Sequence, residues 1–223
     1  KDASLAICRE YAGKHACVRV FDQPNGGPSA ARNTALGHAA GDYVAFVDSD
    51  DTVEPGAFQR MLGAIGDAEM LIAHFNYIIN DKPVDRGLVK ETVILTREEM
   101  LHKLAMKPGS YYYGALWNKL YARRLIEENR IRFDTFFNWA EDLEFNMHCY
   151  RNARHVAFLK EPVYNYRRAV RGQSYRALLD VNHSILIKSR LYKALKEMYK
   201  ACGMYERYRP YIFRYIFNVT LSE

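Results

Sequence analysis

The sequence lacks several features that would place it in a class at once. No apolar run approaches the roughly 18 residues of a membrane-spanning helix, and there is no internal repeat or flexible linker. No GxxxxGK[ST] element is present, which excludes a P-loop. The 4 cysteines show no CxxC spacing and no secretory leader is visible, so reduced thiols in a cytosolic protein are the simplest interpretation.

The composition is that of an ordinary globular protein. Of the 223 residues, 49% are hydrophobic and 26% are charged, which excludes a fibrous or disordered chain. The net charge of +6 suits an anionic partner, namely nucleic acid, a membrane surface or a phosphorylated substrate. Acidic residues dominate two short stretches, 48–51 and 141–144, whereas basic residues crowd 151–214. Because a solvated basic face explains the charge equally well, we expect no nucleic-acid partner.

The first half of the chain alternates between helix and strand signals. We expect, in order, a helix over Ser4–Gly13, a strand over Val18–Phe21, a helix from Pro28 to Gly41, a strand over Tyr43–Val47, a helix opened by Thr52 and Pro55, and a strand over Met70–Ile79. This alternation predicts an α/β fold with a largely parallel sheet. The continuous apolar run Tyr43–Val47 is typical of a central strand covered on both faces.

The pattern changes after Asn80. We expect, in order, a turn at Asn80–Pro83, an antiparallel strand over Thr92–Leu95, a capping box of Thr96 and Glu99, strands over His155–Leu159 and Val163–Arg167, and a helical segment from Ala177 with Leu179, Ile185, Leu186 and Leu191 on one stripe. The sequence therefore predicts one α/β domain over residues 1–176 and a helical extension over residues 177–223.

Three carboxylates follow the apolar run within four residues, Asp48-Ser49-Asp50-Asp51. Such a cluster repels itself unless a cation neutralises it. Oxygen ligands at the end of a strand suit Mg²⁺ or Mn²⁺ shared with the phosphates of a substrate, and open α/β sheets bind ligands beyond the carboxyl ends of their strands. The alternative is a solvated acidic turn that caps the next helix.

Two further segments carry candidate functional residues. Glu141 and Asp142 are expected in the first turn of a helix, where the helix dipole keeps a carboxylate ionised and oriented, as a general base requires. The common alternative is ordinary charge at a helix start. In the segment from Asn25 to Asn33, glycines allow close approach of a ligand and Arg32 is able to meet phosphate.

These segments, in this order, resemble family 2 glycosyltransferases of the GT-A fold, as found in bacterial capsule and lipopolysaccharide synthesis. The similar segments are Asn25-Gly26-Gly27 with Ala31-Arg32-Asn33, Val47 to Asp51, Glu141-Asp142, Trp117 to Tyr121, and Tyr164 to Arg167 with Gly172-Gln173-Ser174. The resemblance covers residues 1–174. It implies a GT-A-like, Rossmann-like mixed sheet, mostly parallel and flanked by helices.

The resemblance also implies roles for individual residues. Asp50 is expected as the principal ligand of Mg²⁺ or Mn²⁺, with Asp48 at the metal or the ribose and Asp51 in support. Asp142 is expected as the catalytic base with Glu141 beside it. Asn25 is expected to help bind the donor. Arg32 and Lys119 are candidates for the donor phosphates or for local structure, and the candidates for a closing segment are Arg167, Arg168 and Ser174.

The chain departs from the family pattern at two points. Family members usually begin with a strand, a helix and a second strand that ends in an Asp-rich turn holding the nucleobase. Lys1–Ser4 is similar to the family segment just after that turn, so the first β-α-β unit is expected to be missing and this chain alone is not expected to be fully active. Arg168 stands where some relatives place a metal-binding His.

The expected reaction is metal-dependent, inverting transfer of a sugar from a nucleotide-diphosphate donor to a saccharide or lipid-linked acceptor. A sugar-1-phosphate nucleotidyltransferase and a non-catalytic binding module are the alternatives. The expected location is cytoplasmic. Arginines and aromatic residues alternate over Tyr205–Val219, which suits either a helix packed on its own domain or peripheral contact with the inner face of the plasma membrane.

Overall fold

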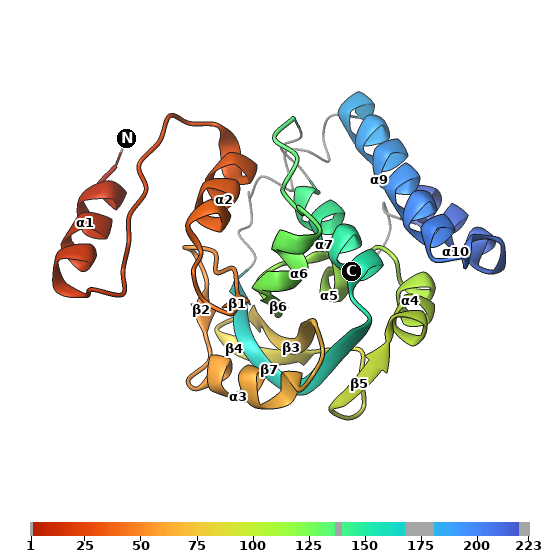
Figure 1. The fold of residues 1–223 in the computed structure, drawn as a ribbon, viewed down its shortest axis with the longest axis horizontal. Coiled ribbons are helices and arrows are strands. Elements are labelled where there is room, and N and C mark those ends of the chain that lie inside the picture. The colour runs from red at the N-terminus through yellow and green to blue at the C-terminus, as the bar shows by residue number, and fades with distance from the viewer. Residues whose placement is uncertain (1, 137–139, 168–180, 219–223) are drawn as a thin grey trace.

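The computed structural model describes residues 2–136, 140–167 and 181–218. It contains a seven-stranded mixed sheet with helices packed around it (Figure 1). The helices are α1 (Ser4–Lys14), α2 (Gly27–His38), α3 (Ala57–Ile65), α4 (Arg97–Met106), α5 (Tyr111–Gly114), α6 (Arg123–Glu128), α7 (Glu141–Asn152), α9 (Val181–Ala201) and α10 (Tyr205–Asn218). The strands are β1 (Tyr43–Val44), β2 (Thr52–Val53), β3 (Met70–Ile79), β4 (Lys82–Arg86), β5 (Val93–Thr96), β6 (Lys119–Ala122) and β7 (His155–Arg167).

The sheet confirms the predicted mixed α/β class but corrects the predicted proportion of parallel strands. The strands lie in the order β1-β6-β3-β7-β2, with β4 also paired to β3 and β5 to β7. Among the described strands, only β3 and β7 pair in parallel, and every other pair is antiparallel. Helices separate only some of the strands along the sequence, and short antiparallel strands fill the positions beside the central parallel pair.

Two predicted strands are corrected. The run Tyr43–Val47 is not a central strand, because only Tyr43–Val44 is extended, and it pairs with β6 alone at one end of the described sheet. Its residues are accordingly more exposed than a central strand allows, with Val47 51% exposed. The segment Val18–Phe21 pairs with no strand, and Phe21 instead packs on His38 of α2 with ring centroids 4.0 Å apart.

The second half follows the prediction more closely. β3 has the predicted bounds, and the turn after it places Asn80 and Asp81 at positive φ before β4 pairs back on β3. The capping box of Thr96 and Glu99 is present at the start of α4. The strands predicted on either side of Pro162 are one strand, β7, with an irregular register against β3 near that proline.

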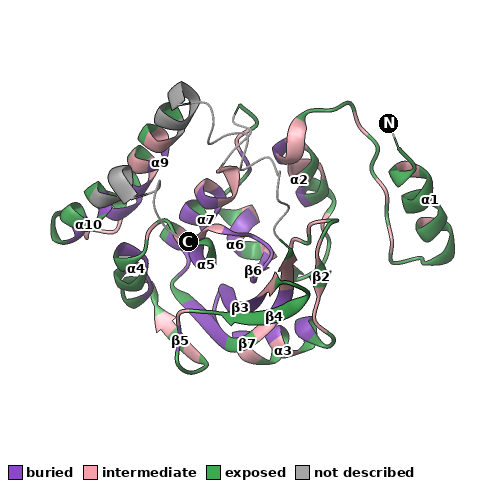
Figure 2. Cartoon of the chain, turned by 180° about the vertical axis from the view of Figure 1, so that it is seen from behind, coloured by how far each residue is buried: buried purple, intermediate pink, exposed green. Residues whose placement is uncertain are grey.

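The buried core lies in β3, β7 and the helices packed against them, whereas α1 is almost wholly exposed (Figure 2). α3 packs against β3 and β7 on one side of the sheet, and α5, α6 and α7 lie on the other (Figure 1). The amphipathic character of α3 explains its position, since Ala57, Met61 and Ile65 recur at helical spacing and are buried.

The two C-terminal helices pack onto this framework. α9 contacts α7, and α10 contacts both α9 and α4. Leu191 is buried as predicted, but Leu186 is 67% exposed and does not belong to the inward stripe. Leu179 and the side chain of Ile185 lie outside the described residues. No helix in the described ranges is both long and apolar enough to cross a membrane.

Candidate active site

The first acidic cluster forms a loop between β1 and β2 that is bound to the end of β7. The Tyr164 hydroxyl donates to Asp51 Oδ2 (3.0 Å) and accepts from the backbone N–H of Asp48 (3.1 Å). Asp51 Oδ1 accepts from the backbone N–H of Arg167 (2.8 Å). These contacts hold the loop in place while leaving Asp50 exposed, with no hydrogen bond or ion pair to any described residue.

The three carboxylates of this loop therefore differ in their surroundings. Burial raises the pKa of Asp51, opposed by its hydrogen bonds from Arg167 and Tyr164 and reinforced by the neighbouring charges of Asp50 and Asp48. The Asp51 side chain accepts hydrogen bonds from β7, and Asp48 forms an ion pair with an arginine that is described below. Asp50 remains the carboxylate most available to a ligand from solvent.

The second acidic cluster opens α7. Glu141 and Asp142 lie in its first turn, after Ala140 in the left-handed region with φ of 63°. Carboxylates at this end of a helix are stabilised by the aligned peptide dipoles. The helix is held by its buried face, to which Phe145, Met147 and Tyr150 belong. The predicted position of Asp142 at a helix start is confirmed.

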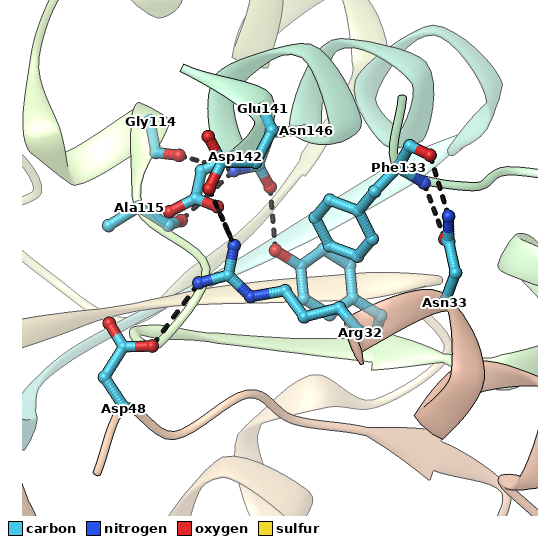
Figure 3. A network of polar contacts seen from close by, with 10 residues as sticks. Arg32, Asn33, Asp48, Gly114, Ala115, Phe133, Glu141, Asp142 and Asn146 are labelled. Carbon is cyan, nitrogen blue, oxygen red and sulfur yellow. Dashed lines mark hydrogen bonds and ion pairs between the residues drawn. The ribbon is translucent and has the colours of Figure 1, made fainter. Parts of the chain in front are cut away.

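The two acidic clusters meet at Arg32 of α2 (Figure 3). One guanidinium nitrogen, Nη1, donates to Asp142 Oδ1 at 2.7 Å and to Glu141 Oε1 at 3.0 Å. The other, Nη2, reaches Asp48 Oδ1 at 3.4 Å. The side chain of Arg32 is only 18% exposed, so these ion pairs are shielded from bulk water. The structure thus joins all three of the segments that carry the predicted chemistry.

Asn33, the residue after Arg32, connects α2 to the segment that contains Phe133. The Asn33 side chain donates to the carbonyl of Phe133 (2.8 Å) and accepts from its backbone N–H (2.9 Å). The Phe133 ring lies 5.5 Å from the Arg32 guanidinium and stacks on Phe145 of α7 with centroids 4.2 Å apart. Sequence reasoning had assigned no role to Asn33 or Phe133, although Asn33 belongs to the segment that carried the resemblance.

The pKa of Asp142 is the most telling electrostatic property of the site. Burial raises this pKa to about 7, against the opposing effect of Arg32, while the charges of Glu141 and Asp48 raise it further. Arg32 binds Oδ1, and within the described part of the chain no hydrogen bond occupies Oδ2. The Asp142 side chain is 29% exposed, so it is accessible to a bound substrate. Such a carboxylate is suited to accept a proton near neutral pH.

Two predicted phosphate-binding candidates have local structural contacts instead. The Lys119 side chain is fully buried, and its ammonium donates to the Tyr112 carbonyl (3.0 Å), to Asn118 Oδ1 (2.9 Å) and to the Ala115 carbonyl. Of the two roles expected for Lys119, these contacts favour local structure. Asn25 is exposed, and its side chain accepts from the backbone N–H of Gly27 (3.1 Å) at the start of α2.

A polar residue that the sequence did not single out supports α7 from inside. Asn146 is fully buried, donates to the carbonyls of Gly114 (2.8 Å) and Ala115 (3.1 Å), and accepts from the Tyr121 hydroxyl (2.8 Å) (Figure 3). These contacts tie the active-site helix to β6 and to the end of α5. Its signal in the sequence is a polar side chain on the apolar face of α7, one turn after Asp142.

The described residues contain no group of three His, Cys, Asp or Glu side chains placed to hold a metal ion by themselves. The donor set nevertheless fits a hard divalent cation, which commonly takes one or two carboxylates and completes its shell with phosphate oxygens and water. Asp50 and Asp48 are the residues available for that role. Arg168 and Ser174, named as candidates for a closing segment, lie outside the described residues.

The comparisons with known proteins bear on the family and the fold. A family model described as Glycosyl transferase family 2 matches residues 1–158. The chain is 34% identical over 171 residues to the uncharacterized glycosyltransferase EpsJ of Bacillus subtilis, covering 74% of this chain and 49% of the relative. Staphylococcus aureus TarS in complex with UDP-GlcNAc superposes with a TM-score of 0.65 at 23% identity, covering 90% of this chain and 60% of that one.

A more distant likeness is the mannosyltransferase PcManGT of Pyrobaculum calidifontis in complex with GDP-Man and Mn²⁺. Its TM-score is 0.54 at 15% identity, covering 100% of this chain and 64% of that one.

The fold is that of the GT-A glycosyltransferases, with a mixed sheet and its acidic loop beside the start of a helix. The chain belongs to glycosyl transferase family 2. The chain spans about half the length of two curated relatives that it matches, namely 49% of EpsJ and 49% of EpsH from the same organism. The predicted family and fold class are confirmed.

Proposed function

We propose that this chain forms the donor-binding and catalytic part of an inverting glycosyltransferase. The observation that carries the proposal is the convergence of Asp48, Glu141 and Asp142 on the single guanidinium of Arg32. Residues 48 and 142 are far apart in the sequence, and their association supports a proton acceptor beside a loop suited to a cation and a diphosphate. A scaffold whose acidic turns only cap helices does not need that association.

Asp142 acts as the general base. Its carboxylate accepts the proton of an acceptor hydroxyl, and the resulting oxygen attacks the anomeric carbon from the face opposite the nucleotide. The new glycosidic C–O bond forms as the bond from the anomeric carbon to the phosphate oxygen breaks, so the stereochemistry inverts and nucleoside diphosphate leaves. A pKa of about 7 makes Asp142 a stronger base than an ordinary aspartate while leaving it largely ionised slightly above neutral pH.

Asp50, with Asp48, would hold Mg²⁺ or Mn²⁺. Such a cation, when bound, balances the charge that develops on the leaving diphosphate. The roles of this chain's own residues are distinct: Tyr164 and Arg167 fix the loop through Asp51, and Arg32 holds Asp142 in position. Binding of Mn²⁺ and GDP-Man by PcManGT, and of UDP-GlcNAc by TarS, supports a nucleotide-sugar donor.

The acceptor is a saccharide or a lipid-linked acceptor, in a polysaccharide-forming reaction on the cytoplasmic side of the membrane. The exposed aromatic side chains of α10, Tyr211 (39% exposed) and Phe213 (50%), support peripheral contact with an anionic membrane, whereas Tyr208 and Ile212 of the same helix face the protein. Flotation with anionic vesicles tests this contact. Equal recovery of the wild type and of a Tyr211→Ser, Phe213→Ser variant in the floating fraction would end the membrane interpretation.

The test of the reaction is a product assay on the full-length protein. The protein is incubated with a panel of nucleotide sugars and saccharide acceptors, with Mn²⁺ or with a chelator, and the released nucleotide products are separated. The proposed metal-dependent glycosyltransferase should release nucleoside diphosphate only when the cation is present. Release of pyrophosphate in the presence of a nucleoside triphosphate and a sugar phosphate would favour a nucleotidyltransferase instead. No product with any donor would overturn the proposal.

A further inference from the structure

A second arginine binds the helix that carries Asp142. Arg190 of α9 donates through Nη2 to Glu144 Oε1 at 3.1 Å and, through the same nitrogen, to the Asp134 carboxylate. Its Nε also reaches Glu144 Oε1 at 3.4 Å. Glu144 is 18% exposed and Arg190 is 29% exposed, so the ion pair is partly shielded from solvent. Such pairs fix geometry better than fully exposed ones.

The two carboxylates that Arg190 binds lie next to the candidate site. Glu144 belongs to the first turn of α7, and its backbone N–H donates to the Ala140 carbonyl at 3.2 Å. Asp134 follows Phe133, the residue that Asn33 holds through two backbone hydrogen bonds. Figure 1 shows the segment after α6 lying between α2 and α9. It is therefore held from both sides, by Asn33 of α2 and by Arg190 of α9.

Beside this contact, α7 and α9 border a groove that is open to solvent. A surface cavity of about 380 Å³ lies between the two helices, and Glu144 and Arg190 are among its lining residues, together with Met147 and Met198. The ion pairs of Arg190 connect the helices at the edge of this cavity. Loss of those pairs would therefore leave the start of α7 with fewer restraints on the side of α9, rather than being absorbed by dense apolar packing.

We propose that Arg190 is a positioning residue for sugar transfer. It fixes the Phe133–Asp134 segment and the first turn of α7, so that Asp142 keeps its place against Arg32. Helix α9 thus belongs to the active-site architecture, and Arg190 acts on Asp142 through Glu144 and Asp134. This inference rests on the proposed function, because it assigns Asp142 the role of base. Small displacements of a catalytic group slow a reaction steeply even when binding is retained.

Kinetics of the full-length protein test the inference. In the Arg190→Gln variant we expect kcat to fall about ten-fold while the donor KM changes by less than about two-fold, because the base is displaced but the donor loop is not. Arg190→Lys keeps the charge but not the two guanidinium nitrogens that bind Glu144 and Asp134, so it should recover only part of the rate. The matched control is Lys193→Gln, an exposed residue of the same helix, which should transfer like the wild type. A fall in kcat no larger than that of the control would overturn the inference.

Two further variants keep the inference testable if Arg190→Gln folds poorly. Asp134→Asn and Glu144→Gln each remove one partner while leaving Arg190 paired to the other, and each should lower kcat by a smaller factor. Adding Asp134→Asn to Arg190→Gln should cause no further loss, because Arg190→Gln already breaks the contact that Asp134→Asn removes. Fully multiplicative losses in the double variant would show that the residues act independently and would contradict the inference.

The same experiment separates this inference from the proposed function. All rates are measured on protein whose folded fraction is verified by circular dichroism, beside wild type and Asp142→Asn. If the wild type transfers sugar, Asp142→Asn does not, and Arg190→Gln matches Lys193→Gln, then only the positioning role is wrong. If the wild type releases no nucleoside diphosphate from any donor, the proposed function fails and the positioning role falls with it.

Discussion

The two acidic clusters contain similar residues in contrasting surroundings. In the loop 48–51, Asp50 is exposed and without a protein partner among the described residues, and its neighbours are bound by β7 and Arg32. At the start of α7, Glu141 and Asp142 are largely buried and share the same arginine. The contrast shows that adjacent carboxylates acquire different chemistry from their burial and their partners rather than from their sequence.

This difference gives the two clusters separate roles in the proposed reaction, cation binding and proton acceptance. An exposed carboxylate without a protein partner is free to bind a hard cation together with phosphates. A buried carboxylate is disfavoured in its charged form, which raises its pKa and its strength as a base. Arg32 connects the two, because it approaches Asp48 at 3.4 Å and Asp142 at 2.7 Å.

The largest effect is expected from Asp142→Asn in the full-length protein. The amide occupies the same space but accepts no proton, so transfer should fall about 10³-fold, within the range that general bases contribute. Donor affinity, measured by calorimetry with Mn²⁺ and the nucleotide sugar, should change little. The matched control is Asp67→Asn, an exposed aspartate before β3, which should leave transfer intact. Transfer by Asp142→Asn near the wild-type rate would refute the division of roles.

The next largest effect is expected from Asp50→Asn. Removing the most available carboxylate of the loop should weaken Mn²⁺-dependent binding of nucleoside diphosphate by at least about ten-fold. Binding in the presence of a chelator should be equal in wild type and variant, since the cation is then absent from both. Calorimetry with and without Mn²⁺ measures both quantities. Unchanged Mn²⁺ dependence in Asp50→Asn would move the cation site away from this loop.

Local signals in the sequence located most of the elements on which this contrast depends. The apolar strand Met70–Ile79, the capping box at Thr96 and the helix start at Glu141 each follow from short-range preferences, and all three are present. The order of the motifs carried the resemblance and hence predicted the family. The sequence did not predict which carboxylate is exposed and which is buried, because burial depends on the tertiary contacts around each residue.

The errors have the same origin. Tyr43–Val47 is as apolar as a central strand, yet it lies at one end of the described sheet, because strand order is set by long-range pairing rather than by local hydrophobicity. Which of the two expected roles belonged to Lys119 stayed open for the same reason, since Lys119 and Arg32 are both basic residues near the motifs, yet one is buried among carbonyls and the other binds three carboxylates. Sequence alone offers no distinction between these two environments.

Substitution of Arg32 tests the connection between the clusters. Arg32 lowers the pKa of Asp142, so Arg32→Ala should raise that pKa above about 7 and move the acidic limb of the kcat/KM profile to higher pH, because the base must be unprotonated. Breaking the ion pairs should also cost about 3 kcal/mol of unfolding free energy. Arg32→Lys retains the charge and should shift the limb less. A profile that stays unchanged in Arg32→Ala would mean that another group controls the limb.

The smallest effect is expected from Asp51→Asn, the residue of the loop that faces inward. The amide retains one oxygen for the Arg167 N–H or the Tyr164 hydroxyl, so the variant should lose about 1 kcal/mol of unfolding free energy. Mn²⁺-dependent nucleotide binding should weaken far less than in Asp50→Asn, because Asp51 fixes the loop without facing the ligand. Denaturant unfolding and the same calorimetry give the two values. Equal losses of binding in both variants would show that the loop binds the cation through all of its carboxylates, and the contrast between exposed and anchored positions would then be wrong.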